Sequence, residues 1–234
     1  MANSAEPSTQ HPKVKLAAPL WHTLGLLMIL LAISLALVQM RSRQHHYGNV
    51  TLYSSVIISE WALSFYIWIG GMIPGAARLH DLVGGCWSNI KDVLHDIALA
   101  AVFWVAVTGV AVFVIFALGS SQTKPIGFLD PRGVAEVTLW VAMSITAGFC
   151  EELVYRGYLQ RQFLALTGNA VFAVLAQGVL FGVAHWYQGF KMVIVITLLG
   201  ILFGMLAYWR KSLRPGMIAH ALGDIVNLVA ICLP

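Results

Sequence analysis

The chain of 234 residues is long enough for one domain or at most two small ones. Hydrophobic residues make up 59% of it and charged residues 10%, against about 45–50% and about 25% in ordinary soluble domains. This composition excludes a water-soluble globule, and it also excludes a disordered chain, which needs low hydrophobicity and high charge. The net charge of +4 comes from basic residues spread between apolar runs, so the sequence gives no support to nucleic-acid binding.

The first predicted element is a membrane helix over residues 20–40. Residues 1–19 before it are polar and predict a flexible tail. The run 20–40 is free of charge and 21 residues long, which exceeds the about 7–15 residues of a signal-peptide core and is enough to cross the bilayer. We therefore expect a retained transmembrane helix.

Six further apolar runs follow along the chain. They span roughly residues 51–73, 97–118, 137–150, 162–190, 192–209 and 215–234, and the third of these continues past Glu151, Glu152 and Arg156 to about residue 166. Backbone amides in lipid need internal partners, so these runs predict helices. The expected fold is all-α, a polytopic transmembrane bundle of about seven helices. Residues 74–95 predict a connector with a short interfacial helix.

The distribution of basic residues predicts the orientation. With seven crossings, more lysines and arginines fall on the side of the amino terminus than on the other side. The positive-inside rule then favours a cytoplasmic amino terminus. We expect an integral, multi-pass protein of a prokaryotic cell membrane, with lipid as its surroundings. Three scattered cysteines form neither a disulfide framework nor a Cys-x-x-Cys metal site.

Ionisable residues inside the apolar runs cluster in the last hundred residues. Each costs about 2.5–3.5 kcal/mol to insert into a membrane, so each needs a structural or functional reason. They form three motifs, Glu151-Glu152-x-x-x-Arg156, Phe181-x-x-x-His185 and His220-x-x-x-Asp224. Two more carboxylates, Glu60 and Glu136, lie outside the motifs.

Helical spacing suggests different roles for the two adjacent glutamates. Glu152 and Arg156 are four residues apart with the acid first, the favourable order for an intrahelical ion pair. Glu151 points about 100° away from Glu152 and is free to face another partner. The pair would neutralise one carboxylate and leave the other for chemistry. Alternatively, both acids simply flank Arg156 at a membrane boundary.

The second motif is predicted to lie at the same depth as the first. If Thr167-Gly168-Asn169 is the turn of a hairpin, Glu151 lies 17 residues before Gly168 and His185 lies 17 after it. Both side chains then sit about 25 Å from the turn. An interhelical hydrogen bond is the structural alternative for His185.

The third motif places His220, Asp224 and Asn227 on one helix face, at i, i+4 and i+7. A proton relay or a structural hydrogen bond is an alternative to catalysis here. Straight, full-length crossings would put His220 near the membrane surface opposite His185. The three motifs meet only if the turn at 210–215 dips inward or the preceding helix is short and tilted.

Together the three motifs, in this order, resemble the CPBP family of intramembrane proteases, which includes the CAAX prenyl endopeptidases and the bacterial Abi proteins. The likeness covers about residues 148–228 and extends to Arg156-Gly157-Tyr158-Leu159-Gln160 and Gly200-Ile201-Leu202-Phe203-Gly204. It implies a protease-like core over 134–234, preceded by three membrane helices and their connectors over 20–133.

The resemblance also implies roles for individual residues. Glu151 and His185 would activate the attacking water, and His220 with Asp224 would support the oxyanion. The family pattern allows Asn at position 224, and an ionised Asp would repel an oxyanion. Asp224 would therefore need a proton or would orient His220, with Asn227 as a possible substitute donor. Glu152 and Arg156 would support the site from behind.

The expected activity is thus a glutamate-type endopeptidase without metal or cofactor, acting on a membrane-associated peptide or protein that carries, in one version, a prenyl group. A zinc protease using His185, His220 and a carboxylate is an alternative, although no His-Glu-x-x-His helix is present. A non-catalytic immunity or transport protein is the other alternative. The sequence lacks the Gly-x-Ser-x-Gly elbow that a serine protease would need. It also lacks the second suitable membrane aspartate that an aspartyl protease would need.

Overall fold

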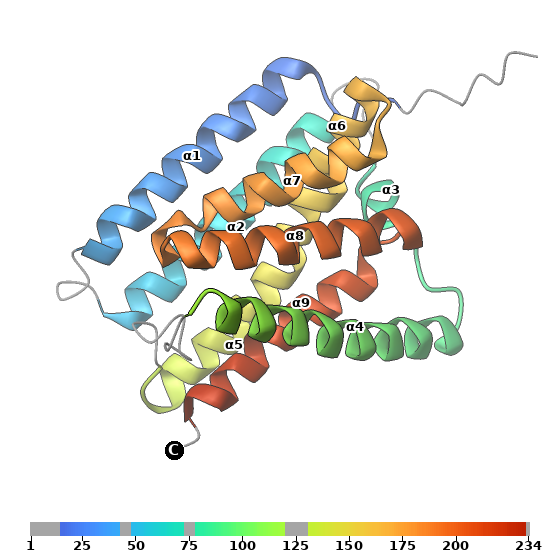
Figure 1. Cartoon of the computed structure of the whole chain (residues 1–234). Helices are drawn as coiled ribbons and strands as arrows, with labels where there is room; N and C mark the ends of the chain where they lie inside the picture. Colours follow the sequence, from blue (N-terminus) through green and yellow to red (C-terminus); the bar gives the residue numbers. More distant parts are fainter. Residues whose placement is uncertain (1–14, 43–47, 73–77, 120–130, 233–234) are drawn as a thin grey trace, which may run out of the picture.

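The computed structural model of the chain describes residues 15–42, 48–72, 78–119 and 131–232, and these ranges contain helices and no strand (Figure 1). The long helices are α1 (Leu20–Ser42), α2 (Asn49–Met72), α4 (Ile90–Ala117), α5 (Gly133–Glu151), α7 (Ala170–Ala184), α8 (Phe190–Arg210) and α9 (Arg214–Cys232). The shorter ones are α3 (Leu79–Val83), a π-helix (Glu152–Leu159), α6 (Gln160–Thr167) and a 3-10 turn (Trp186–Gln188).

Each of the seven apolar runs contains a helix, so the prediction of an all-helical bundle is confirmed; the run 162–190 is divided by the turn at Gly168 into the end of α6 and α7. In the described ranges, five helical stretches are long and apolar enough to cross a membrane, including one continuous stretch, Gly133–Thr167, that joins α5, the π-helix and α6. The interruption by charged residues therefore does not break the helix. A further apolar helix, α7, has 15 residues, and the connector contains the expected short helix, α3.

The turn between α6 and α7 forms where the sequence predicts it. Gly168 ends α6 in a left-handed conformation with φ of 66°. Glycine adopts this conformation at little energetic cost because it has no Cβ. The Asn169 side chain then accepts a hydrogen bond from the Phe172 amide and caps α7. These two residues close an antiparallel helix pair, which fixes the relative depth of α5 and α7.

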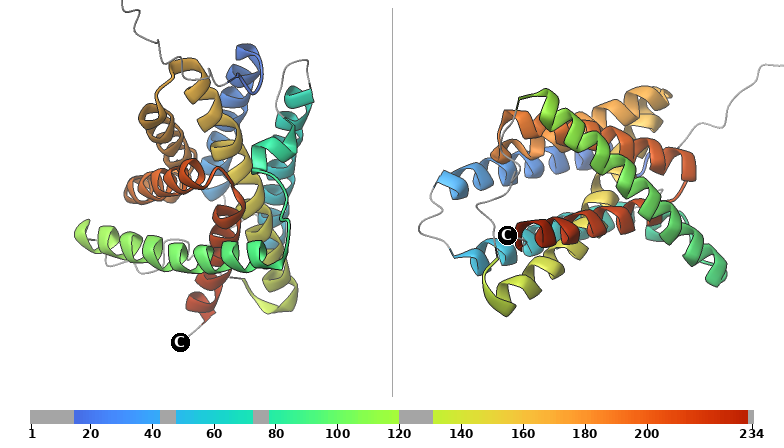
Figure 2. Two further views of the ribbon diagram at one scale, coloured as in Figure 1. Left: turned by 90° about the vertical axis from the view of Figure 1, so that its right-hand side faces the viewer. Right: turned by 60° about the horizontal axis from the view of Figure 1, so that its bottom comes forward.

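The stretch from α5 through the π-helix lies in the middle of the bundle. It packs against α2 on one side and α9 on another, while α7 packs along α8. Helix α4 lies across α9 at a large angle in all three views (Figures 1 and 2). Because so many elements surround this stretch, its polar side chains are enclosed by protein rather than by lipid.

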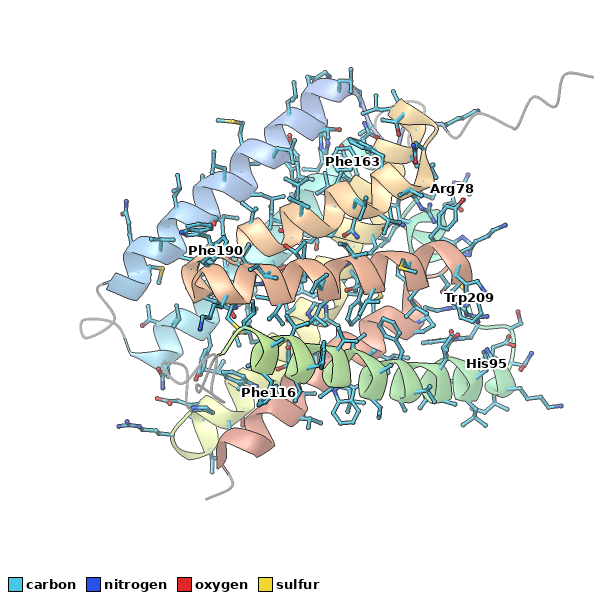
Figure 3. The ribbon with its side chains drawn as sticks, viewed as in Figure 1. Arg78, His95, Phe116, Phe163, Phe190 and Trp209 are labelled. Carbon is cyan, nitrogen blue, oxygen red and sulfur yellow. The ribbon has the colours of Figure 1, made fainter. Side chains whose placement is uncertain are left out.

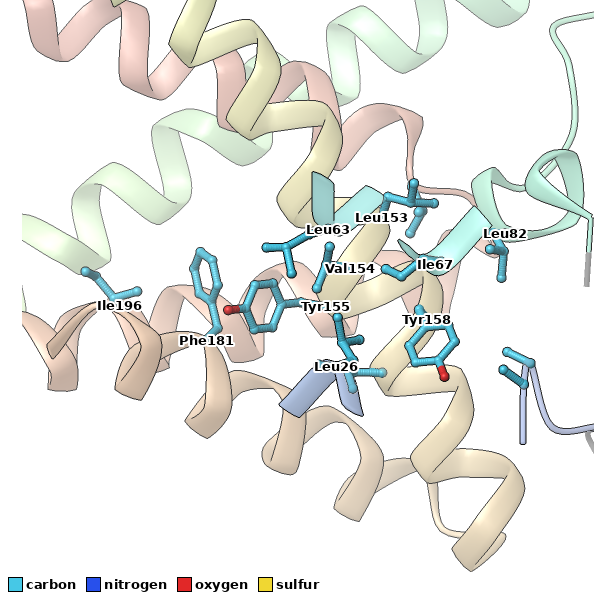
Figure 4. Packing of buried hydrophobic residues seen from close by; sticks show 14 residues of the cluster. Leu26, Leu63, Ile67, Leu82, Leu153, Val154, Tyr155, Tyr158, Phe181 and Ile196 are labelled. Carbon is cyan, nitrogen blue, oxygen red and sulfur yellow. The ribbon is translucent and has the colours of Figure 1, made fainter. Parts of the chain in front are cut away.

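The largest hydrophobic cluster surrounds the π-helix (Figure 4). Leu153, Val154 and Tyr158 from this segment are at most 2% exposed. They pack with buried residues of other elements, among them Leu26, Leu63, Ile67, Phe181 and Leu213. The burial of apolar side chains on several faces holds the charged residues of the same segment in place.

Most large apolar side chains outside this cluster point outward. Phe116, Phe190 and Trp209 are 65–82% exposed and project from the ribbon in Figure 3. A soluble protein rarely exposes so much apolar surface in one piece. This outer face suits a hydrocarbon surrounding, in agreement with the predicted membrane location.

The beginning of the chain is anchored to α6. Residues 1–14 of the predicted tail lie outside the described ranges. The Ala17 amide donates to Gln162 Oε1 at 2.9 Å, and Gln162 Nε2 donates to the Ala18 carbonyl at 2.7 Å. Gln162 is fully buried, so residues 17–18 are held against the bundle rather than being part of a free tail.

Candidate active site

The two adjacent glutamates lie where the helix changes its winding. Glu151 is the last residue of α5, and Glu152 is the first of the π-helix. A π-helix is rare and is often found at functional sites, because it changes the angle between successive side chains. The change occurs at the first motif.

Close approach of α9 to α5 brings the third motif to the first. A Cβ added at Gly148 would lie 2.8 Å from the Ala221 amide nitrogen and 2.9 Å from the Met217 carbonyl oxygen. Glycine is therefore required for this contact. His220 directly precedes Ala221 and is placed beside Glu151 and Glu152.

Glu152 and Arg156 form a buried ion pair. Arg156 Nη1 donates to Glu152 Oε1 at 2.9 Å, and Nη2 donates to the Gly200 carbonyl at 3.3 Å. Both side chains are at most 1% exposed. The guanidinium carbon also lies 4.4 Å from the centroid of the Phe181 ring, in cation–π contact. The predicted pair is thus present and sits inside the protein rather than at a boundary.

Glu151 faces the histidines of both other motifs. Its Oε1 lies 3.7 Å from His185 Nε2, and its Oε2 lies 3.5 Å from His220 Nε2. The three side chains are 12–15% exposed. The equal depth predicted for Glu151 and His185 is realised. His220, however, also contacts Glu152, so the two glutamates share one partner.

Hydrogen bonds on the far side of each imidazole define which nitrogen faces Glu151. A carbonyl or carboxylate oxygen only accepts, so Nδ1 carries the proton in both rings. His185 Nδ1 donates to the Phe181 carbonyl at 2.8 Å. His220 Nδ1 donates to Glu152 Oε1 at 3.0 Å. Both Nε2 atoms are left for the space in front of Glu151, as accepting nitrogens in the neutral rings.

The turn before α9 resolves the depth of His220. Ser212 and Leu213 are at most 5% exposed, and the Leu213 amide donates to the Val83 carbonyl at 2.9 Å. Lys211 ends α8 in a left-handed conformation with φ of 51°. The turn therefore lies inside the fold, against the end of α3, and His220 reaches the site although only six residues separate it from the start of α9.

Asp224 lies at the rim of the same group. Its Oδ2 is 3.8 Å from His220 Nε2, and its side chain is 36% exposed. The backbone carbonyl of Asp224 accepts a hydrogen bond from Trp140 Nε1 at 3.0 Å, which ties α9 to α5. Asn227 belongs to α9, but its side chain lies outside the described residues.

A cavity of about 380 Å³ opens in front of these residues. Glu151, His185, His220 and Asp224 line one part of it, and mainly apolar side chains from α1, α2, α4, α5 and α8 line most of the rest. A mainly apolar pocket with a few converging polar groups is the usual form of a binding site for an apolar ligand. The carboxylate and the two imidazoles thus face the interior of a mainly apolar cavity.

One further carboxyl group, from outside the three motifs, reaches the site. The Glu60 carboxyl group on α2 lies beside the Glu151 side chain. One signal in the sequence points to it, an ionisable residue in the middle of an apolar run. Its partner could not be read from helical spacing, because α2 and α5 are separate helices.

Within the described ranges, no group of three His, Cys, Asp or Glu side chains has the geometry of a metal site. The arrangement is a carboxylate with two imidazole Nε2 atoms that line one part of a mainly apolar pocket. These are the groups that a hydrolase uses to activate water and to stabilise an oxyanion. The fold and the site together define the class: a polytopic helical membrane protein with a carboxylate–imidazole centre beside an apolar cavity.

Comparison with known proteins finds a family that resembles the part of the chain that carries the site. Residues 133–226 match the family described as type II CAAX prenyl endopeptidase Rce1-like. This confirms the resemblance indicated by the three motifs: residues 133–226 are similar to a family of prenyl endopeptidases. The uncharacterized protein YpbD of Bacillus subtilis (strain 168) is 26% identical over 150 residues, which are 60% of this chain and 75% of that protein. No solved structure matches the chain.

Proposed function

We propose that the protein is an intramembrane endopeptidase of the glutamate type, in which Glu151 and His185 activate water. The observation that supports this most is the position of Glu151, whose carboxylate faces both imidazoles at 3.5–3.7 Å at one end of an apolar cavity. These separations exceed a direct hydrogen bond of about 2.7–3.2 Å. A carboxylate and an imidazole Nε2 that both accept can instead be joined by a water molecule that donates to each.

The reaction follows from these positions. The oxygen of the water molecule attacks the peptide carbonyl carbon while Glu151 takes a proton from that water. The carbon–nitrogen bond then breaks, and the proton is passed to the leaving amine, with His185 as the relay. The products are a new carboxyl terminus and a new amino terminus. A positioned base contributes about 10²- to 10⁴-fold to such a step.

His220 suits the support of the oxyanion. Glu152 accepts from its Nδ1; when the ring takes up a second proton at Nε2, this carboxylate stabilises the imidazolium, and Nε2–H then donates toward the cavity. Arg156 in turn holds Glu152. Asp224, 3.8 Å from the same Nε2, would orient this ring, because an ionised carboxylate repels an oxyanion. Asn227 one turn later stays a candidate donor.

The substrate class follows from the surroundings of the cavity. Its apolar walls favour a membrane-associated peptide or protein. A prenylated carboxyl-terminal peptide, a secreted bacterial peptide and a membrane-anchored regulator all meet this description. We further propose a multi-pass arrangement in a prokaryotic cell membrane with the amino terminus in the cytoplasm, and no requirement for a cofactor.

Membrane proteomics of cells with the wild-type protein or Glu151→Gln tests the function. The variant keeps the size of the side chain but removes the base. We expect one or a few membrane proteins or peptides to accumulate uncleaved in the variant and to be cleaved at one site by purified wild-type protein in liposomes. Full retention of the in vivo function by folded Glu151→Gln would refute the peptidase and favour a non-catalytic role.

A further inference from the structure

Helix α2 contains a carboxyl group that none of the three motifs uses. Glu60 lies in the middle of the apolar helix Asn49–Met72, and its Oε2 is buried without a hydrogen-bond donor among the described residues. A buried carboxyl group in a membrane helix is costly and needs a partner or a function. Its neighbour across the helix interface is therefore informative.

Three contacts define how α2 lies against α5. Asn49 Nδ2 donates to Glu136 Oε2 at 2.8 Å, and the rings of Tyr53 and Trp140 pack edge to face with centroids 5.7 Å apart. Further along, the rings of Trp61 and Phe149 stack at 5.7 Å. The partners differ by 87 or 88 positions each time. The two helices thus run in the same direction in one register over three turns.

This register brings Glu60 and Ser64, one turn apart on α2, to the end of α5. Ser64 is 5% exposed and lies beside the thiol of Cys150, and the Glu60 carboxyl group lies beside that of Glu151. Ionised carboxylates only accept hydrogen bonds, so a bond between two of them requires one proton. Two carboxylates that share a buried place do not both ionise.

No lysine or arginine pairs with Glu60 or Glu151 among the ion pairs of the described residues. Arg156, the arginine of the first motif, is bound to Glu152. Histidines 185 and 220 contact Glu151 rather than Glu60. A proton is therefore the counter-charge available to the Glu60–Glu151 pair.

We propose that Glu60 is a positioning residue for the base: its protonated carboxyl group donates a hydrogen bond to the Glu151 carboxylate and keeps that carboxylate turned toward His185 and His220. The expected effects on the reaction rate rest on the proposed peptidase function. The active form of the Glu60–Glu151 pair holds one proton. A second proton neutralises the base, and loss of the only proton removes the donor and adds a repelling charge.

Other titratable groups face the pair from every neighbouring element. They are Cys150 on α5, Tyr155 in the π-helix, His185 at the end of α7, Tyr187 in the following turn, and His220 and Asp224 on α9. All of them are unchanged when Glu60 alone is substituted. Differences between Glu60 variants therefore report on the pair.

The kinetic test is the pH–rate profile of full-length protein in liposomes with Glu60→Gln and Glu60→Leu. The glutamine side chain still donates a hydrogen bond to Glu151 but cannot ionise. We therefore expect the acid limb of its pH–rate profile to match that of the wild type, and the fall in rate at alkaline pH caused by deprotonation of the pair to be absent. The leucine cannot donate. Loss of a hydrogen bond to a charged group should move the acid limb up by about one to two pH units and lower the maximal rate.

Glu136→Gln is the matched control. Glu136 is also a glutamate at the α2–α5 interface, bonded to Asn49 at 2.8 Å, but it lies four turns before Glu151. We expect both limbs of its profile to match the wild type. Wild-type profiles for both Glu60→Gln and Glu60→Leu would overturn the proposal.

Infrared spectroscopy provides a readout that needs no substrate. The wild type near neutral pH should show the carbonyl stretch of a protonated carboxylic acid, and this band should be missing in Glu60→Gln and present in Glu136→Gln. A band that persists in Glu60→Gln, or a wild type without it, would overturn the shared proton even if no peptide is ever cleaved. Conversely, the band would support the shared proton even if the cleavage experiments refuted the peptidase function.

Discussion

Replacing Arg156 with methionine should destabilise the protein strongly. The guanidinium group donates to Glu152 at 2.9 Å and to the Gly200 carbonyl at 3.3 Å, and it lies 4.4 Å from the centre of the Phe181 ring. Methionine fills much of the same volume, so the main change is electrostatic. Glu152, which is 0% exposed, loses its cation.

The magnitude follows from this burial. Removing one partner of a buried ion pair costs about 3–5 kcal/mol, whereas an exposed pair is worth about 0–1 kcal/mol. We therefore expect Arg156→Met to lower the free energy of unfolding by about 3–5 kcal/mol. The double variant Glu152→Gln, Arg156→Met has no unpaired charge and should be more stable than Arg156→Met alone.

Reversible unfolding in mixed detergent micelles, followed by tryptophan fluorescence, measures both variants against the wild type. The reasoning is refuted if Arg156→Met falls within about 1 kcal/mol of the wild type, because the pair then behaves as an exposed one. It is also refuted if adding Glu152→Gln lowers the stability of Arg156→Met further. In that case the remaining carboxylate was not the cause of the loss.

Three shorter predictions concern the site and its packing. His220→Ala should lower turnover about 10²- to 10³-fold in a liposome cleavage assay, the usual loss for one oxyanion donor, and a drop below tenfold would contradict that role. Gly148→Val should separate α5 from α9, because its Cβ alone would lie 2.8 Å from the Ala221 amide nitrogen. We expect this variant to lower the free energy of unfolding by about 1–3 kcal/mol or more, and wild-type stability would disprove the close contact. Treatment with 1,10-phenanthroline should leave cleavage unchanged, whereas inhibition reversed by zinc would support a metal centre with His185 and His220.

The apolar runs predicted the helices well because lipid leaves a spanning chain few choices. Backbone groups must be satisfied within the segment, so length and hydropathy alone identify the helix. The same reasoning located the α6–α7 turn at Gly168 and Asn169, where local residues supply the left-handed conformation and the cap. The equal depth of Glu151 and His185 followed, because it depends only on counting residues from that turn.

The depth of His220 was harder to predict. Counting from the turn at 211–213 places it near a membrane surface, and the actual position depends on the burial of Ser212 and Leu213 against the end of α3. The π-helix that begins at Glu152 was not expected either. Helical periodicity assumes 3.6 residues per turn, and a change in winding is stabilised by surrounding contacts that no periodicity contains.

The sequence by itself determined the membrane location, the helical fold and the three groups of ionisable residues. Each of these follows from the free energy of placing a single residue or run in an apolar medium, which does not depend on its neighbours in space. The tertiary structure alone decided that His220 bridges Glu151 and Glu152, and that Glu60 joins them from α2. Such contacts depend on the register between helices distant in the chain, which is set by packing at sites such as Gly148 and Trp61 rather than by any local pattern.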